Sequence, residues 1–486
     1  MIRLKDVRWA YQGGDTAVID GLDLHIRRGE TVVVCGPSGS GKSSALRLMN
    51  GLIPHFHDGT LEGEVRVDGA PITDLAQVGR MTGTVLQHPR RQFFTDAIDT
   101  ELAFALENFG TPPPRIRDRV AEVVADFGLT DLDGRLRELS GGQQQRVACA
   151  AAVTHGPPLL LLDEPTSNLS PRGIADLTAI LRHVRELGTT VVIAEHRLHY
   201  LRELADRIVV LHAGRVAREW TRAEFAGLTD EMLRGEGLRS LDAPERTAVA
   251  PAFARGPSVG PAQTSPNETE QAARTTSPGP DADGAGVVLR GIRCAFRGRP
   301  ALDIAEAHLP VGAITAVTGP NGAGKTTLAR ILAGLQRHTG QVLLDGRPLS
   351  RSRRQRESAI VMQDVQRQLF TDSVTAELRL GATSDHADHA TTVLAALDLD
   401  GFGDRHPLSL SGGQQQRLVV ATARLSGRRI VIFDEPSSGV DRRHLQSMTR
   451  TMRDVAEGGA VVVLISHDAD LLTLAADQEL HLRPIR

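Results

Sequence analysis

The chain has 486 residues, 41% of them hydrophobic and 24% charged, which is typical of a globular protein with at least two domains. Its net charge of -3 provides no broad basic field, which argues against nucleic acid as a partner. The N-terminal stretch MIRLKDVRWAY lacks the apolar core of a signal peptide, and no apolar run approaches the about 18 residues of a membrane helix, so we expect a protein of the cytosol or of a membrane's cytosolic face.

Short, continuous apolar runs alternate with helical patterns along the first half. The runs TVVVCG (31–36), LLLLD (159–163) and TTVVIAEH (189–196) predict parallel strands that are buried on both faces. Between them, TELAFALENFG (100–110) and SPRGIADLTAILRHVREL (170–187) predict helices. The alternation predicts a three-layer α/β architecture with a central parallel sheet.

Three segments recur in the second half in the same order, which indicates a tandem domain duplication. The repeated pairs are GPSGSGKSS (36–44) with GPNGAGKTT (319–327), LSGGQQQR (139–146) with the same letters at 410–417, and LLLLDEPTS (159–167) with IVIFDEPSS (430–438). We therefore expect one domain at 1–234 and a second at 287–486. Residues 235–286 are rich in Pro, Ala, Gly, Ser and Thr, and predict a flexible linker.

Both glycine-rich loops fit the pattern G-x-x-x-x-G-K-[ST] between an apolar strand and a helix, which predicts two nucleotide sites. The lysine of such a loop reaches phosphate oxygens. Only three of the 56 basic residues in this chain are lysines, and two of them, Lys42 and Lys325, lie in these loops. The next hydroxyl, of Ser43 or Thr326, is expected to bind Mg²⁺. The loop residues are Gly36, Pro37, Ser38, Gly39, Ser40, Gly41, Lys42, Ser43 and Ser44, and Gly319, Pro320, Asn321, Gly322, Ala323, Gly324, Lys325, Thr326 and Thr327.

Each half also carries two adjacent carboxylates at the end of an apolar run, in the sequence D-E-P. Asp163 and Asp434 would complete the Mg²⁺ shell, and Glu164 and Glu435 would polarise the attacking water. A D-E-P sequence can also simply begin a surface turn. Polar residues that follow other strands could reach the metal, the water or the γ-phosphate: Gln87, Gln363, His196 and His467.

With these motifs in this order, both halves resemble the ATP-binding cassette ATPases. The resemblance implies cassettes with a mainly parallel central sheet, a small antiparallel β subdomain and a helical signature subdomain. It also implies that the two cassettes pair within the chain, each SGG loop closing the ATP site of the other half. The residues that it adds are Ser140, Gly141, Gly142 and Gln143, Ser411, Gly412, Gly413 and Gln414, and Tyr11 and Phe296, which match the position that stacks on adenine but could equally be core aromatics.

One position departs from the family pattern. The second half has SSGVD after its D-E-P, with Asp441 where the family usually has aspartate, whereas the first half has TSNLS, with Ser170. Equal activity of the two sites is therefore in question, although we expect both to hydrolyse ATP.

The residues that follow Gln87 and Gln363 indicate which process the ATPase would power. The stretches 90–108 and 366–381 share RQ-x-F-T-D and resemble the energy-coupling-factor transporters, where a groove grips a helix of the membrane protein. This implies an importer of a vitamin or transition-metal ion on the cytoplasmic membrane face, whose partners are an integral membrane coupling protein and a small substrate-binding subunit. A sugar- or peptide-type importer ATPase and a ribosome- or DNA-associated ATPase are the alternatives. The apolar side chains Phe93, Phe94, Leu369 and Phe370 would line the groove or else pack in the core.

Overall fold

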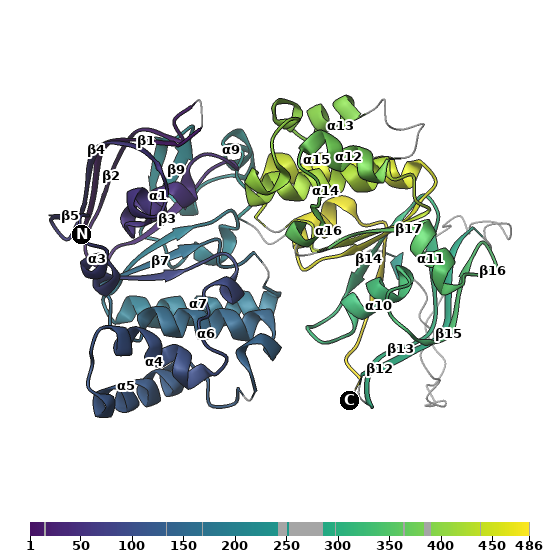
Figure 1. Ribbon diagram of the computed structural model, residues 1–486, viewed down its shortest axis with the longest axis horizontal. Coiled ribbons are helices and arrows are strands. Elements are labelled where there is room, and N and C mark those ends of the chain that lie inside the picture. Colours follow the sequence, from purple (N-terminus) through teal and green to yellow (C-terminus); the bar gives the residue numbers. More distant parts are fainter. Residues whose placement is uncertain are drawn as a thin grey trace, which may run out of the picture. The chain divides into compact units, whose positions relative to one another are not determined.

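The computed structural model describes residues 1–13, 16–132, 134–167, 169–241, 250–251, 285–296, 298–362, 365–382, 390–437 and 439–485. The chain divides into two compact units, Met1–Pro244 with Ser437–Leu445, and Glu245–Pro436 with Gln446–Arg486 (Figure 1). Among the described residues, no helix is long and apolar enough to cross a bilayer.

The first unit is built around a six-stranded sheet with the strand order β10-β9-β3-β8-β7-β6. Strands β9, β3, β8, β7 and β6 are parallel, and β10 pairs with β9 in the antiparallel direction, so the sheet is mainly parallel, as predicted. The strands are β3 (Thr31–Cys35), β6 (Thr82–Val85), β7 (Leu159–Asp163), β8 (Thr190–Ala194), β9 (Arg207–His212) and β10 (Arg215–Thr221).

The continuous apolar strands have both faces covered. In β3, Val33 and Cys35 join one core with helices α6 (Gly141–Val153) and α7 (Pro171–Glu186). Val32 and Val34 point the other way, into a core with α1 (Lys42–Met49) and the second sheet of this unit. Because successive side chains of a strand alternate between faces, a strand covered on both sides needs an unbroken apolar run.

A smaller sheet and several helices complete the first unit (Figure 1). The sheet is antiparallel, in the order β2-β1-β4-β5, and confirms the predicted β subdomain. Its strands are β1 (Ile2–Tyr11), β2 (Ile19–Ile26), β4 (Gly59–Val67) and β5 (Ala70–Pro71). The other helices are α2 (Leu52–His55), α3 (Leu75–Met81), α4 (Ile98–Asn108), α5 (Pro113–Asp126), α8 (Arg222–Ala226) and α9 (Asp230–Gly235).

The second unit repeats this plan. Its main sheet is parallel, in the order β11-β20-β14-β19-β18-β17, and its smaller sheet is antiparallel, in the order β13-β12-β15-β16. The strands are β11 (Ala250–Pro251), β12 (Gly286–Phe296), β13 (Arg299–Pro310), β14 (Ile314–Thr318), β15 (Thr339–Leu344), β16 (Arg347–Pro348), β17 (Ser358–Val361), β18 (Ile430–Asp434), β19 (Val461–Ile465) and β20 (Gln478–His481). The helices are α10 (Lys325–Leu332), α11 (Arg351–Glu357), α12 (Val374–Gly381), α13 (Ala390–Ala396), α14 (Gly412–Leu425), α15 (Arg442–Glu457) and α16 (Ala469–Ala475).

The first residues of the expected linker are folded rather than flexible. Leu238 and Leu241 are buried and join the helical core of the first unit. Two leucines in a stretch without apolar periodicity gave no signal for this packing. The linker residues 242–249 and 252–284 lie outside the described part of the chain.

Candidate active site

The first phosphate loop connects β3 to α1 and is organised around Lys42. Its Nζ donates to the carbonyl oxygens of Gly36 and Pro37, at 3.0 Å each, and the residue is only 5% exposed. Burial lowers the pKa of Lys42, while the charges of Glu164 and Asp441 act in the opposite direction. A cation enclosed by a backbone loop at a helix N-terminus is a site for phosphate oxygens.

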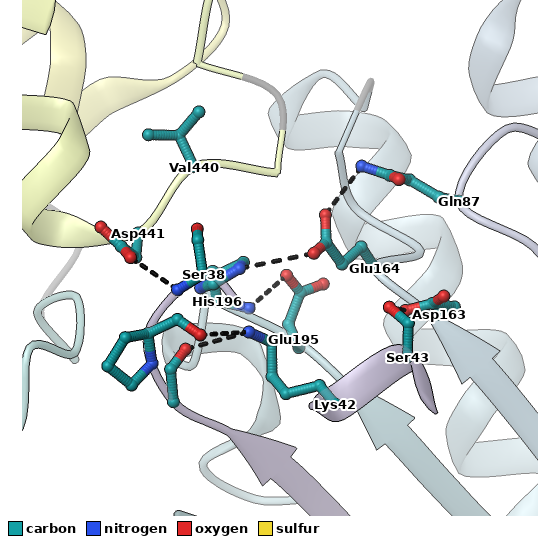
Figure 2. A network of polar contacts seen from close by, with 12 residues as sticks. Ser38, Lys42, Ser43, Gln87, Asp163, Glu164, Glu195, His196, Val440 and Asp441 are labelled. Atoms are coloured by element: carbon teal, nitrogen blue, oxygen red, sulfur yellow. Dashed lines mark hydrogen bonds and ion pairs between the residues drawn. The ribbon is translucent and has the colours of Figure 1, made fainter. Parts of the chain in front are cut away.

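The hydroxyl and the carboxylate that we expect to bind Mg²⁺ lie next to each other beside this loop. Ser43 Oγ donates to Asp163 Oδ1 at 3.0 Å (Figure 2). Burial, with the charge of Glu164, raises the pKa of Asp163. Hard oxygen ligands of this kind suit Mg²⁺, which also returns a buried carboxyl to its charged form, so the residues present fit the ion.

Glu164 follows β7 in the left-handed backbone region, at φ 45°, and its N–H donates to the Ala194 carbonyl at 2.8 Å. Gln87 Nε2 donates to its Oε2 at 2.8 Å, and His196 Nε2 lies 3.4 Å from Oε1 (Figure 2). Burial would raise the pKa of Glu164, but the hydrogen bond and charge of His196, with the charges of Lys42 and Arg239, hold it below its usual value. The group is thus kept as a carboxylate, which a general base requires.

A further buried carboxylate, Glu195, supports this arrangement and was not identified from the sequence. It is 2% exposed and accepts from Thr166 Oγ1 at 2.7 Å and from the His196 backbone N–H at 2.8 Å. It also accepts from the Arg197 backbone N–H and from the Tyr200 hydroxyl, at 3.1 and 3.2 Å. The matching position in the second half is occupied by Ser466. Glu195 is therefore not part of a repeated motif, and the repeat gives no signal for it.

The second site has the same frame. Lys325 Nζ donates to the carbonyls of Gly319 and Pro320, at 2.8 and 3.1 Å. Burial raises the pKa of Asp434, and a hydrogen bond from Thr326 opposes this rise.

The second D-E-P glutamate, Glu435, has φ 52°. Its Oε2 accepts from Ser466 Oγ at 3.3 Å and from the His467 backbone N–H at 3.2 Å. Gln363 lies outside the described residues.

The repeated LSGGQ segments begin α6 and α14. Ser140 Oγ accepts from the Gln143 N–H while Gln143 Oε1 accepts from the Ser140 N–H, and Ser411 and Gln414 form the same reciprocal pair. This capping box explains the spacing of serine and glutamine in the motif. Between them, the Gly141–Gly142 and Gly412–Gly413 backbones open the helix N-termini. That each loop closes the site of the other half stays a prediction.

The two aromatic residues expected beside adenine end the strands β1 and β12. Tyr11 is half-buried, its hydroxyl lies 3.0 Å from Ser44 Oγ, and its ring packs edge-on against Trp9 at 5.4 Å. Phe296 is 43% exposed. Their stacking on adenine remains a prediction.

The segments that follow the glutamines expose one phenylalanine in each half. Phe94 is 74% exposed and Phe370 is 76% exposed, whereas Leu369 is buried and Phe93 packs against the core. Two of the four expected groove residues therefore face inward, because neighbouring side chains of this segment point to opposite sides. Core packing is the correct interpretation for those two.

A buried glutamate holds each exposed phenylalanine in place. Glu101, 6% exposed, accepts from the backbone N–H groups of Phe94 and Thr95, at 3.1 and 2.9 Å, and from Thr95 Oγ1 at 3.0 Å. Glu377 Oε2 accepts from the corresponding groups of Phe370 and Thr371, at 2.9, 2.9 and 2.8 Å. The exposure of the rings is thus fixed by the same hydrogen bonds twice, once in each unit.

Comparison with known proteins agrees with this geometry. The family model described as ABC transporter matches residues 19–167 and 302–438. A Treponema denticola protein named as a candidate ABC transporter ATP-binding protein is 38% identical over 480 residues, 97% of this chain and 93% of that protein. One from Streptomyces coelicolor, named likewise, is 34% identical over 97% of this chain and 90% of its own. The solved structure of RNase-L Inhibitor covers 99% of this chain and 90% of its own, with a TM-score of 0.61 and 20% identity, and shares the fold.

Proposed function

Because the chain belongs to the ABC transporter family, we propose that this two-cassette ATPase is the ATP-hydrolysing subunit of a membrane transporter, of the energy-coupling-factor type that imports a vitamin or a transition-metal ion. It would act at the cytoplasmic face of the membrane, bound to an integral membrane coupling protein. The two relatives above carry transporter names, which supports the transport class over ribosome- or DNA-associated ATPases.

The first site supports hydrolysis through its own residues. Lys42 would bind the β- and γ-phosphates, and Ser43 and Asp163 would hold Mg²⁺, which neutralises phosphate charge when bound. The carboxylate of Glu164 would orient the attacking water and accept its proton, with Gln87 and His196 holding both oxygens of the carboxylate in place. Lys325, Thr326, Asp434, Glu435 and His467 would take these roles in the second site.

The observation that carries the transport proposal is the pair of exposed phenylalanines, each fixed by a buried glutamate. Phe94 stacks on Phe104 with ring centroids 4.4 Å apart, which forms a flat apolar platform on α4 and the segment before it. Water-exposed aromatic rings held rigidly at matching places in both halves favour a partner that presents one apolar helix to each half. A membrane coupling protein meets this description.

The experiment is affinity purification of the tagged chain from detergent-solubilised membranes, with the co-purified proteins identified by mass spectrometry. The proposal predicts a multi-helix coupling protein and a small membrane substrate-binding protein. Their recovery should fall at least about tenfold in the double variant Phe94→Ala, Phe370→Ala, since two buried phenylalanines contribute about 3 kcal/mol or more.

Phe56→Ala is the matched control, because Phe56 is 70% exposed but lies outside this segment. This variant should recover the membrane proteins as the wild type does. Recovery of ribosomes, DNA or a conventional permease pair would contradict the coupling-factor proposal. Undiminished recovery by the double variant would show that the exposed rings do not bind the partner.

A further inference from the structure

A short segment of the second cassette belongs to the first compact unit. Ser437–Leu445 follows the second D-E-P in sequence but clusters with Met1–Pro244. Its described residues lie against the first phosphate loop and against the stretch that follows α9.

Asp441 bonds in two directions. Its Oδ1 accepts from the backbone N–H and from Nδ1 of His444, at 2.8 Å each, at the start of α15. Its Oδ2 accepts from the backbone N–H of Ser38, in the phosphate loop, at 2.6 Å (Figure 2). The residue is 2% exposed, so one buried carboxylate joins a helix N-terminus to the loop that would bind phosphate.

The stretch Asp230–Arg239 forms hydrogen bonds and an ion pair with the segment Ser437–Leu445. Arg239 is 3% exposed and donates through Nε to the Val440 carbonyl at 3.0 Å and through Nη2 to the Ser437 carbonyl at 3.4 Å. Asp230 forms a two-pronged ion pair with Arg442, at 2.7 and 2.9 Å. A buried guanidinium that satisfies two loop carbonyls fixes the path of the backbone between them.

The backbone of this segment passes close to the carboxylate of Glu164. Gly439 has φ +69°, and a Cβ built on it would lie 2.4 Å from Glu164 Oε2 and 2.6 Å from Gln87 Nε2. A side chain at this position would displace the ends of the Glu164 and Gln87 side chains. The charge of Arg239 also contributes to the low pKa of Glu164. The segment therefore bounds the place where the attacking water would stand.

We propose that Asp230–Arg239 is a clasp that holds Ser437–Arg442 against the first ATP site, with Arg239 as a positioning residue for hydrolysis at that site. The inference rests on the proposed ATPase function and adds to the first site a positioning residue from the stretch after α9. Neither Arg239 nor Asp230 belongs to a motif shared by the two halves.

The clasp also gives the Ser170–Asp441 difference a physical meaning. Ser170 begins α7, and its single side-chain oxygen accepts from the Gly173 N–H at 3.3 Å. Asp441 has a second oxygen for Ser38 after capping its own helix. A serine has a single side-chain oxygen, so Ser170 cannot cap its helix and accept from a second backbone N–H as Asp441 does.

Hydrogen exchange tests the clasp without any need for hydrolysis. Backbone amides of 437–445 should be protected in the wild type and should exchange at least about tenfold faster in Arg239→Gln, because the two carbonyl bonds are lost. Arg182→Gln is the control, since Arg182 is 52% exposed in its side chain and lies in α7. Equal exchange in wild type and Arg239→Gln would overturn the clasp, while ATP turnover by the wild type separately reports on the proposed function.

The positioning role is tested with one site active at a time. In the Glu435→Gln background, which leaves the first site, Arg239→Gln should lower kcat about tenfold or more with KM for ATP changed less than about twofold. In the Glu164→Gln background, which leaves the second site, it should change kcat less than about twofold. Equal losses in the two backgrounds would overturn the positioning role.

Asp441→Asn covers the case in which Arg239→Gln fails to fold. The amide has nearly the same shape and keeps one oxygen for the helix cap, but it lacks the second oxygen that accepts from Ser38. It should reproduce the selective loss of kcat at the first site. An unchanged kcat there in Asp441→Asn would contradict the proposal.

Discussion

The glutamates after β7 and β18 share a left-handed backbone, but their distances to the following histidine ring differ. Glu164 accepts from Gln87 at 2.8 Å, and His196 Nε2 lies 3.4 Å from its other oxygen. Glu435 accepts from the Ser466 hydroxyl and the His467 backbone N–H, and His467 Nε2 lies 3.9 Å from its other oxygen. Identical D-E-P motifs therefore do not guarantee identical positioning.

The difference traces to the residue before each histidine. Glu195 accepts from four donors of its own, and as a carboxylate it has no proton to donate to Glu164. Ser466 is shorter and bonds Glu435 directly. The two halves can thus hold the same carboxylate beside different neighbours.

The largest expected effect comes from removing each catalytic carboxylate. Glu164→Gln and Glu435→Gln should each reduce hydrolysis at their own site by about a hundredfold or more, because an amide cannot accept the water's proton. The measurement is steady-state ATP hydrolysis at saturating Mg²⁺ and ATP, with both single variants and the double variant.

Glu203→Gln is the control, because the Glu203 side chain is 86% exposed. It should leave the rate unchanged. If one single variant hydrolysed ATP as fast as the wild type, that site would contribute nothing, and the two-site account would be wrong.

A smaller effect should distinguish Glu195 from Ser466. Glu195→Gln replaces one of two acceptor oxygens with a donor among four donors, and should cost about 2 kcal/mol or more in the free energy of unfolding. Ser466→Ala removes a hydroxyl that bonds Glu435 and accepts from the Asp468 N–H, and should cost about 1 kcal/mol. Urea unfolding of both variants compares the two costs. Equal losses would show that Glu195 has no special structural role.

The smallest effect concerns pH. Burial and the charge of Lys42 lower the pKa of His196 below 6.5, although Glu164 opposes them. The unfolded chain therefore binds this proton first, and stability is lost as pH falls below about 6.5. His196→Asn should lose less stability than the wild type between pH 7 and pH 5. NMR titration of the His196 ring should give a pKa below 6.5, and a value above it would contradict the proposed electrostatics.

The sequence predicts much of the fold because the fold follows local patterns. Unbroken apolar runs identify strands such as β3 and β7, whose two faces are both covered. The phosphate loops, the D-E-P carboxylates and the capping serines are local motifs, and repetition makes each one easier to recognise. Lys42, Ser43, Asp163 and Glu164 lie together as that pattern predicts.

What the sequence does not reveal depends on long-range contacts. Arg239 bonds to residues about 200 positions away, and nothing in its neighbourhood indicates burial. Glu195 has no equivalent in the second half, so repetition could not identify it. Glu101 has an equivalent in the second half, Glu377, but only the folded backbone shows that these glutamates hold the exposed rings of Phe94 and Phe370.

Stimulation of ATP hydrolysis by the co-purified membrane proteins, measured in proteoliposomes, decides whether the exposed phenylalanines couple this ATPase to a transporter. The membrane proteins should raise the hydrolysis rate of the wild type and of Phe56→Ala. The double variant Phe94→Ala, Phe370→Ala should keep its basal rate but lose the stimulation. Equal stimulation of the double variant, or stimulation by ribosomes instead of the membrane proteins, would show that these rings do not couple the ATPase to a membrane partner.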